Sequence, residues 1–178
     1  GFYYDFDLPR PLTDADLETI TKNMRKIINS GREFVRKEVT REEAKEIFKN
    51  QKYKLELLEA IPEGETVTTY TQGSFTDLCR GPHVESTKEL CADGFKLLSI
   101  AGAYWRGNEK NKMLTRIYAT AWGSKEDLRA YMDHLADIEK RDHRKLGKEL
   151  DLFSLHEEAG PGLVYWHPRG ARIRQTIE

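Results

Sequence analysis

Cysteine and long apolar runs are both scarce in this chain. The 178 residues include only two cysteines, Cys79 and Cys91, too few for the disulfide framework of a small secreted protein. No apolar run approaches the ~20 residues of a membrane-spanning helix. Residues 1–7 have neither the basic start nor the long apolar centre of a secretory signal. We therefore expect no membrane partner and a reducing compartment, the cytoplasm, with a mitochondrial location left open.

An excess of positive charge is also missing. The 29 Lys and Arg side chains are balanced by 30 Asp and Glu, which gives a net charge of −1. A protein that binds nucleic acid by charge alone is basic throughout, so any RNA contact here must use local patches. An aromatic content of 10% excludes a disordered composition. The length suits one domain with a real core, or one domain plus a fragment.

The periodicity of the sequence predicts an α+β fold, with a mainly antiparallel sheet and helices packed against it. Strands are expected at 2–7, 34–39, 53–58, 67–71, 95–101, 113–122 and 163–168. Capping boxes predict helices that begin near Thr13 and Thr40. Ser124 caps a long helix with an apolar stripe, expected to continue to about Leu150. A breaker at 159–162 precedes the last expected strand, and a helix is expected at 169–178.

The stretch TDLCRGPHV, residues 76–84, holds the densest set of reactive side chains. Cys79 lies four positions before His83, and Asp77 lies two positions before Cys79. Pro82 disfavours a helix here, so we expect a loop or tight turn that could bring the thiol and the imidazole together. At strand spacing, Asp77 and Cys79 would point to the same face.

The residues alone leave four interpretations of this stretch open. The plainest is a buried cysteine beside a solvated histidine. Cys79 and His83 could instead bind zinc with carboxylate support, although two ligands do not complete a zinc site and Cys91 is interpreted as structural. They could orient a water that attacks an ester while Asp77 holds the substrate. Finally, they could act as a Cys–His nucleophilic pair.

Basic residues elsewhere have structural as well as functional interpretations. Lys54 falls in the expected strand at 53–58, where an edge-strand lysine would discourage aggregation. Five basic residues at helical spacing could follow an RNA backbone: Lys140, Arg141, Arg144, Lys145 and Lys148. The i, i+4 pairs Asp137–Arg141 and Lys145–Glu149 equally favour a solvated helix held by salt bridges.

Several stretches, taken in order, resemble a threonyl-tRNA synthetase. They are GFYYDFD (1–7), TDLCRGPHV (76–84), AGAYWRGNEKNKMLTRIYATAW (101–122) and KRDHRKLGKELDLF (140–153). Alanyl-tRNA synthetases and free-standing alanyl editing proteins share a looser version of the same editing module. GPGLVYWHPRGARIRQTIE (160–178) resembles the entry to a class II catalytic domain. The resemblance implies an editing domain at 1–139, a linker helix at 140–155 and a class II stub at 156–178.

The resemblance also implies site residues. Family members hydrolyse seryl-tRNA(Thr), because one methyl group gives a pocket only ~1–3 kcal/mol of discrimination. Their editing pocket joins an HxxxH pair to a CxxxH pair, which Cys79 and His83 match. Lys54 matches a strand lysine of the pocket, and Asp77 matches a carboxylate that recognises the amino acid. Tyr4 would line the cleft, and the basic helix face would lie near the tRNA acceptor stem.

The same resemblance sets expectations for what lies outside this chain. HxxxH does not occur in the 178 residues, and the family places it upstream of GFYYDF. In the family, the catalytic domain binds ATP, magnesium and a threonine-binding zinc. The whole enzyme binds tRNA(Thr) with its seryl and threonyl esters and is a homodimer. We therefore expect a fragment that cannot ligate threonine and edits weakly or not at all. The rivals are a non-enzymatic tRNA-binding module and a zinc-dependent alanyl-type hydrolase.

Overall fold

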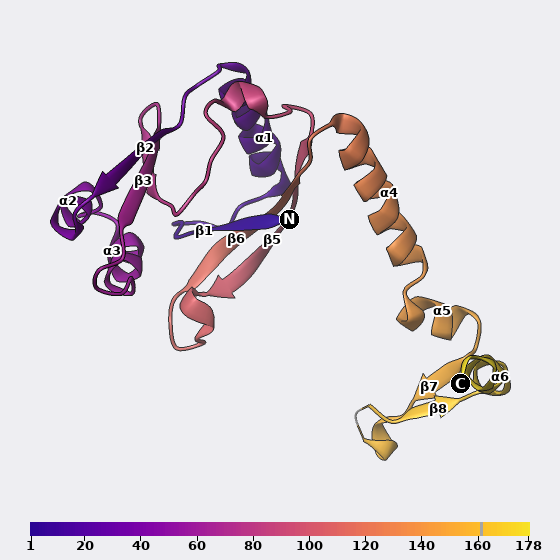
Figure 1. The fold of residues 1–178 in the computed structure, drawn as a ribbon. Helices are drawn as coiled ribbons and strands as arrows, with labels where there is room; N and C mark the ends of the chain where they lie inside the picture. The colour runs from indigo at the N-terminus through magenta and orange to yellow at the C-terminus, as the bar shows by residue number, and fades with distance from the viewer. Residues whose placement is uncertain (161) are drawn as a thin grey trace. The chain divides into compact units, whose positions relative to one another are not determined.

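The computed structural model describes residues 1–160 and 162–178 as two compact units, Gly1–Lys125 and Glu126–Glu178 (Figure 1). Helices and antiparallel sheets alternate along the chain, which confirms the predicted α+β class. None of the described helices is both long and apolar enough to cross a membrane. The units do not test the expected functional domains at 1–139, 140–155 and 156–178, which stay predictions.

The first sheet of the first unit has the strand order β1–β6–β5, with every neighbour antiparallel. Its strands are β1 (Phe2–Phe6), β5 (Phe95–Tyr104) and β6 (Met113–Ala121). Helix α1 (Asp14–Asn29) lies beside this sheet and contacts β5 (Figure 1). The register places Tyr4 opposite Ile117, whose side chain is buried. In the strand order β1 lies at the edge of the sheet, and it carries Tyr4, one of the expected site residues.

The second sheet has the order β2–β3–β4 and holds the apolar core of this region. Its strands are β2 (Val35–Val39), β3 (Val67–Gln72) and β4 (Phe75–Leu78), and helices α2 (Arg41–Ile47) and α3 (Lys52–Glu59) connect β2 to β3. Val39, Ala44, Leu58 and Val67 form a buried cluster, against which Leu78 packs. One residue from each of four elements thus fixes α2 and α3 on the sheet.

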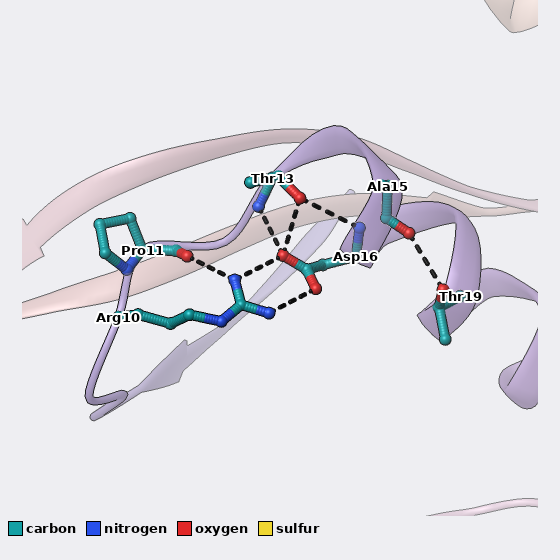
Figure 2. Close-up of polar contacts among 6 residues, drawn as sticks. All are labelled: Arg10, Pro11, Thr13, Ala15, Asp16 and Thr19. Atoms are coloured by element: carbon teal, nitrogen blue, oxygen red, sulfur yellow. Dashed lines mark hydrogen bonds and ion pairs between the residues drawn. The ribbon is translucent and has the colours of Figure 1, made fainter.

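The first turn of α1 shows why the helix begins where the sequence predicts. Thr13 and Asp16 form a capping box in which each side chain accepts a hydrogen bond from the other residue's backbone N–H (Figure 2). The guanidinium group of Arg10 donates hydrogen bonds to the same carboxylate from two nitrogens, at 2.8 and 2.9 Å. These bonds satisfy donors that a helix N-terminus leaves free. The hydrogen bonds from Arg10 and Thr13 hold the pKa of Asp16 far below its usual range.

The expected strand at 53–58 is wrong, because these residues belong to helix α3. Tyr53, Leu55 and Leu57 alternate with polar residues, which imitates the period of a strand. The segment nevertheless contains no β-branched residue and is rich in leucine, lysine and glutamate, which favour a helix. Strand β4 was not expected at all. It forms a hairpin with β3 through the two-residue loop Gly73–Ser74, and Gly73 takes a φ of +60°.

The expectation of one long helix from Ser124 to about Leu150 is wrong. The segment contains α4 (Lys125–Lys140) and α5 (His143–Glu149), with a break between them. The side chain of Asp142 accepts a hydrogen bond from the Arg144 N–H and so starts a new helix. Residues 140–155 therefore hold α5 and strand β7 (Phe153–Leu155) rather than one linker helix.

The end of the second unit agrees with expectation. Strand β8 (Val164–Trp166) pairs antiparallel with β7, and α6 (Pro168–Ile177) follows it with proline in its first turn. In the expected breaker, Gly160 and Gly162 both take a positive φ, whereas Pro161 lies outside the described residues.

Candidate active site

Three elements bring Tyr4, Lys54 and Asp77 together. The Tyr4 hydroxyl of β1 donates a 2.7 Å hydrogen bond to Asp77 Oδ2 on β4. The Lys54 ammonium of α3 donates to the Tyr4 hydroxyl over 3.1 Å and forms an ion pair with Asp77 Oδ1. The structure therefore joins residues that lie 50 and 73 positions apart in the chain.

This cluster is shielded enough for its electrostatics to matter. The side chains of Lys54 and Asp77 are only 19% and 17% exposed. Burial raises the pKa of Tyr4, and its hydrogen bond to Asp77 raises it further. Burial alone would lower the pKa of Lys54, but the hydrogen bonds and charges of Asp77 and Tyr4 outweigh it and raise that pKa. At neutral pH, Lys54 is therefore a cation and Tyr4 a neutral hydrogen-bond donor.

Cys79 and His83 meet across the turn that follows β4. The Nε2 atom of His83 lies 3.0 Å from the Cys79 sulfur, which also accepts a hydrogen bond from the Gly81 N–H at 3.3 Å. The Gly81–Pro82 peptide bond is cis. Because the sulfur faces both a backbone donor and an imidazole, the pair can exchange a proton and orient a water molecule.

Tyr70 of β3 links the two groups, and sequence reasoning missed it. In the β3–β4 register Tyr70 stands opposite Asp77, so both side chains share one face of the sheet. The Tyr70 ring also packs on the ring of His83, with centroids 4.3 Å apart. A tyrosine in a strand gave no signal in the sequence, because its partners come from a hairpin that was not expected.

Two cavities border the candidate site. The larger, of about 600 Å³, is lined by Tyr4 and Lys54 together with β1, the start of α3 and Trp105. The smaller, of about 250 Å³, is lined by Cys79, Thr68 and Leu78 among others. Tyr4 lies in the wall of the larger cavity. The roles of Cys79, His83, Lys54, Asp77 and Tyr4 stay predictions.

The cavity wall also contains residues that the sequence did not single out as a site. Asp7 Oδ2 accepts a 2.7 Å hydrogen bond from the Tyr53 hydroxyl, and Lys112 lies 2.6 Å from its other oxygen. Trp105 donates from its ring nitrogen to Glu56 Oε2 over 2.6 Å. Trp105 belongs to the AGAYWRG stretch, so that stretch was the available signal.

The basic residues at 140–148 do not lie on a single helix face as expected. Lys140 ends α4, Arg141 lies in the break, and the other three belong to α5. The two salt bridges expected from the spacing are confirmed, Arg141–Asp137 at 2.8 Å and Lys145–Glu149 at 4.0 Å, and Arg144 pairs with Asp142. This geometry favours the solvated-helix interpretation, and the tRNA contact stays a prediction.

Zinc does not fit the residues present. Cys79 and His83 supply two donors, and a zinc ion in a protein takes at least three protein ligands. Across residues 1–160 and 162–178, no three His, Cys, Asp or Glu side chains are grouped so that they could hold a metal ion. Cys79 and His83 therefore do not complete a zinc site with the other described residues.

Comparison with known proteins places these residues in a family context. Residues 67–118 match the family model of the threonyl and alanyl tRNA synthetase second additional domain, which covers β3, β4, the Cys79–His83 turn and β5. The chain is 53% identical over 178 residues to the threonine–tRNA ligase of Borrelia recurrentis, covering 100% of this chain and 30% of that protein. For the ligase of Magnetococcus marinus the identity is 54% over 180 residues, covering 100% and 28%.

The chain thus spans about 30% of the length of the curated relatives that it matches. The match is continuous from Gly1 to Glu178 and includes every residue of the candidate site. The resemblance to threonyl-tRNA synthetases that the sequence motifs predict is therefore confirmed along the whole chain, with the second additional domain of the threonyl and alanyl enzymes at its centre.

Proposed function

We propose that this chain is the editing part of a threonine–tRNA ligase, and that it hydrolyses the ester of mischarged seryl-tRNA(Thr) in the whole enzyme. The observation that supports this most strongly is the meeting of Tyr4, Lys54 and Asp77 from three separate elements, with the Cys79–His83 contact in the turn that follows the strand of Asp77. A cation, a carboxylate and a proton-exchanging pair are groups that the hydrolysis of an ester can use.

The proposed reaction is the attack of water on the carbonyl carbon of the seryl ester. Cys79 and His83 orient the water and take up its proton, and the bond between the carbonyl carbon and the ribose oxygen breaks. The proton returns to that oxygen, which releases serine and free tRNA. Lys54 stabilises the developing oxyanion rather than acting as a base, because its raised pKa keeps it charged at neutral pH. Asp77 and Tyr4 hold the polar groups of the amino acid.

The remaining functions belong to the whole enzyme. We assign threonine ligation, with its ATP, magnesium and zinc, to residues outside this chain, together with the HxxxH pair, and we propose that the whole enzyme is a homodimer. tRNA(Thr) is the proposed partner, with its acceptor stem near α5. The cytoplasm is the proposed location, since the cysteine content suits a reducing compartment.

The test is deacylation of seryl- and threonyl-tRNA(Thr) by this chain and by a version extended upstream to include the HxxxH pair. We expect the extended version to hydrolyse the seryl ester and spare the threonyl ester, and this chain to be weak or inactive. Replacing Cys79 and His83 together by alanine should abolish hydrolysis, whereas Cys91→Ala, a matched cysteine control, should preserve it. Hydrolysis of neither ester, or equal hydrolysis after the double replacement, would refute the assignment.

A further inference from the structure

The AGAYWRG turn is the most distinctive sequence feature that the proposed chemistry does not use. β5 ends at Tyr104, and a 3-10 turn, Trp105–Gly107, follows it. The backbone carbonyl of Trp105 accepts a 2.9 Å hydrogen bond from the side-chain amide of Asn111. The backbone N–H of Trp105 donates to the Lys112 carbonyl. These two hydrogen bonds close the turn, and the Trp105 ring nitrogen contacts Glu56 of α3.

The turn makes three contacts with α3, all close to Lys54. The Trp105 ring nitrogen donates to Glu56 Oε2 over 2.6 Å, and Arg106 donates to the Glu56 backbone carbonyl over 2.9 Å. The rings of Trp105 and Tyr53 meet edge to face, with centroids 4.8 Å apart. The contacted residues, Tyr53 and Glu56, stand one position before and two positions after Lys54.

Arg106 reaches α3 from an unfavourable backbone conformation. Its φ of 55° and ψ of 24° lie in the left-handed region, which a residue with a side chain adopts at a cost. Glycine would take this conformation freely. The conformation is held by the turn on one side and by the hydrogen bond to α3 on the other.

Helix α3 depends on contacts of this kind. It has only 8 residues, its N-cap Gln51 makes no side-chain capping hydrogen bond, and Leu58 near its C-terminus is its buried residue. Arg41 donates to the Leu58 carbonyl in the last turn of the helix and to the Pro62 carbonyl in the loop beyond it. Lys54 lies one turn before these anchors, so contacts to the middle of the helix decide where its ammonium points.

We propose that Trp105 and Glu56 form a clamp that positions Lys54 toward Tyr4 and Asp77, which makes the AGAYWRG turn a positioning element of the candidate site. Trp105 also lines the same cavity of about 600 Å³ as Tyr4 and Lys54. Only the effect of the clamp on catalysis depends on the proposed function. The position of Lys54 can be measured without any activity.

The first measurement is the NMR titration of the Lys54 side chain in this chain, assigned by loss of its signal in Lys54→Arg. The titratable groups that face Lys54 are Tyr4 from β1 and Asp77 from β4, and both raise its pKa above the ordinary 10.5. Trp105→Phe and Glu56→Ala release the clamp, so the midpoint should fall toward 10.5. Glu56→Gln keeps an acceptor for the Trp105 N–H and should leave the midpoint unchanged.

Trp166→Phe is the matched control, because it makes the same change in the second unit and should not move the Lys54 titration. An unchanged midpoint in folded Trp105→Phe and Glu56→Ala overturns the clamp. So does an equal shift in Glu56→Gln, because that result would trace the effect to the Glu56 charge. Urea unfolding of each variant identifies those that fold.

The second measurement is seryl-tRNA hydrolysis by the upstream-extended version. Misplacing a charged group by about 1 Å can cost up to ~100-fold in rate, so Trp105→Phe and Glu56→Ala should lower kcat about 10- to 100-fold with little change in KM. Glu56→Gln should keep kcat at the value of the unsubstituted protein. A shifted Lys54 titration with unchanged hydrolysis supports the clamp and refutes the proposed role of Lys54. An unchanged Lys54 titration overturns the clamp whatever the hydrolysis measurement gives.

Discussion

Both carboxylate oxygens of Asp77 contact hydrogen-bond donors. Lys54 and the Leu78 N–H contact Oδ1, and the Tyr4 hydroxyl contacts Oδ2. With so many donors, the carboxylate is held in one orientation. Removing its charge would leave Lys54 with Tyr4 as its remaining partner in a shielded place.

Asp77→Asn is therefore expected to lower the free energy of unfolding by about 1–3 kcal/mol, the cost of an unsatisfied shielded charge. Urea denaturation measures it. The matched control is Asp93→Asn, because the Arg25–Asp93 pair is 47% and 59% exposed. Such exposed pairs contribute about 0–1 kcal/mol. Equal losses in both variants would contradict a special role for the Tyr4–Lys54–Asp77 cluster.

Tyr4 and Lys54 give stability a defined pH dependence. Both pKa values are raised in the folded state, so the folded protein holds these protons more tightly than the unfolded chain. Their contribution is complete below the ordinary tyrosine value of 10.0 and is lost as the pH rises through the folded pKa. We expect the unfolding free energy to fall less steeply above pH 10.0 in Tyr4→Phe. Urea titrations at several alkaline pH values would show parallel curves if Tyr4 is not shifted.

Gly81 shapes the Cys79–His83 turn through two independent constraints. Its φ is +71°, and a Cβ at this position would collide with the Tyr70 hydroxyl. Gly81→Ala should lower the free energy of unfolding by more than ~1 kcal/mol and displace His83 from Tyr70. Gly123→Ala is the control, since a Cβ there meets nothing within 4 Å. NMR shifts of the His83 ring measure the displacement, and an unmoved ring would contradict the prediction.

At the scale of elements, α3 joins the apolar core to the candidate site. Leu58 is fully buried among Val39, Ala44 and Val67, while Lys54 on the preceding turn of the helix reaches Asp77. Packing in the core therefore sets the place from which the ammonium extends.

Leu58→Ala should cost about 2–5 kcal/mol of unfolding free energy, from lost burial and the cavity left behind. Leu57→Ala is the control, because that neighbouring leucine is 41% exposed. Urea denaturation of both variants gives the comparison. Similar losses would show that α3 is not anchored through Leu58.

The β7–β8 hairpin is closed by a polar network rather than by apolar packing alone. His167 accepts or donates on both ring nitrogens, with Asp151 at 2.8 Å and Ser154 at 3.0 Å. Ser154 also contacts His156 at 2.9 Å. The order of carboxylate, imidazole and hydroxyl is that of a catalytic triad, but Asp151 is 84% exposed, so the network is best understood as a closure of the hairpin.

The sequence predicted elements well where a local signal exists. The capping boxes at Thr13 and Thr40 both start helices. It failed at 53–58, where apolar alternation imitated a strand, and at Asp142, where a cap interrupts a periodic stretch. In the site, the Cys79–His83 contact was foreseeable because Pro82 favours a tight turn between the two residues. The meeting of Tyr4 with Asp77 depends on how two sheets lie together, which no local pattern contains.

At the scale of the molecule, all contacts that join Tyr4, Lys54 and Asp77, or Cys79 and His83, lie within the unit Gly1–Lys125. Both sheets and their buried residues belong to the same unit. This unit should therefore fold without residues 126–178.

A chain that ends at Lys125 is expected to unfold cooperatively and to give the same amide NMR shifts as the full chain around Tyr4 and Asp77. Thermal unfolding followed by circular dichroism and a two-dimensional amide spectrum provide the measurements. A non-cooperative transition, or changed shifts at those residues, would show that the second unit contributes to the site.

The pairing of Lys54 with Asp77 has a consequence for any amine that enters the cleft. The protein already supplies an ammonium group to this carboxylate, tethered at high effective concentration. A ligand amine must displace this internal ammonium before it can bind, so the carboxylate holds every amine more weakly than a free carboxylate in the same place would. Loosening the tether would let the carboxylate bind any amine more readily.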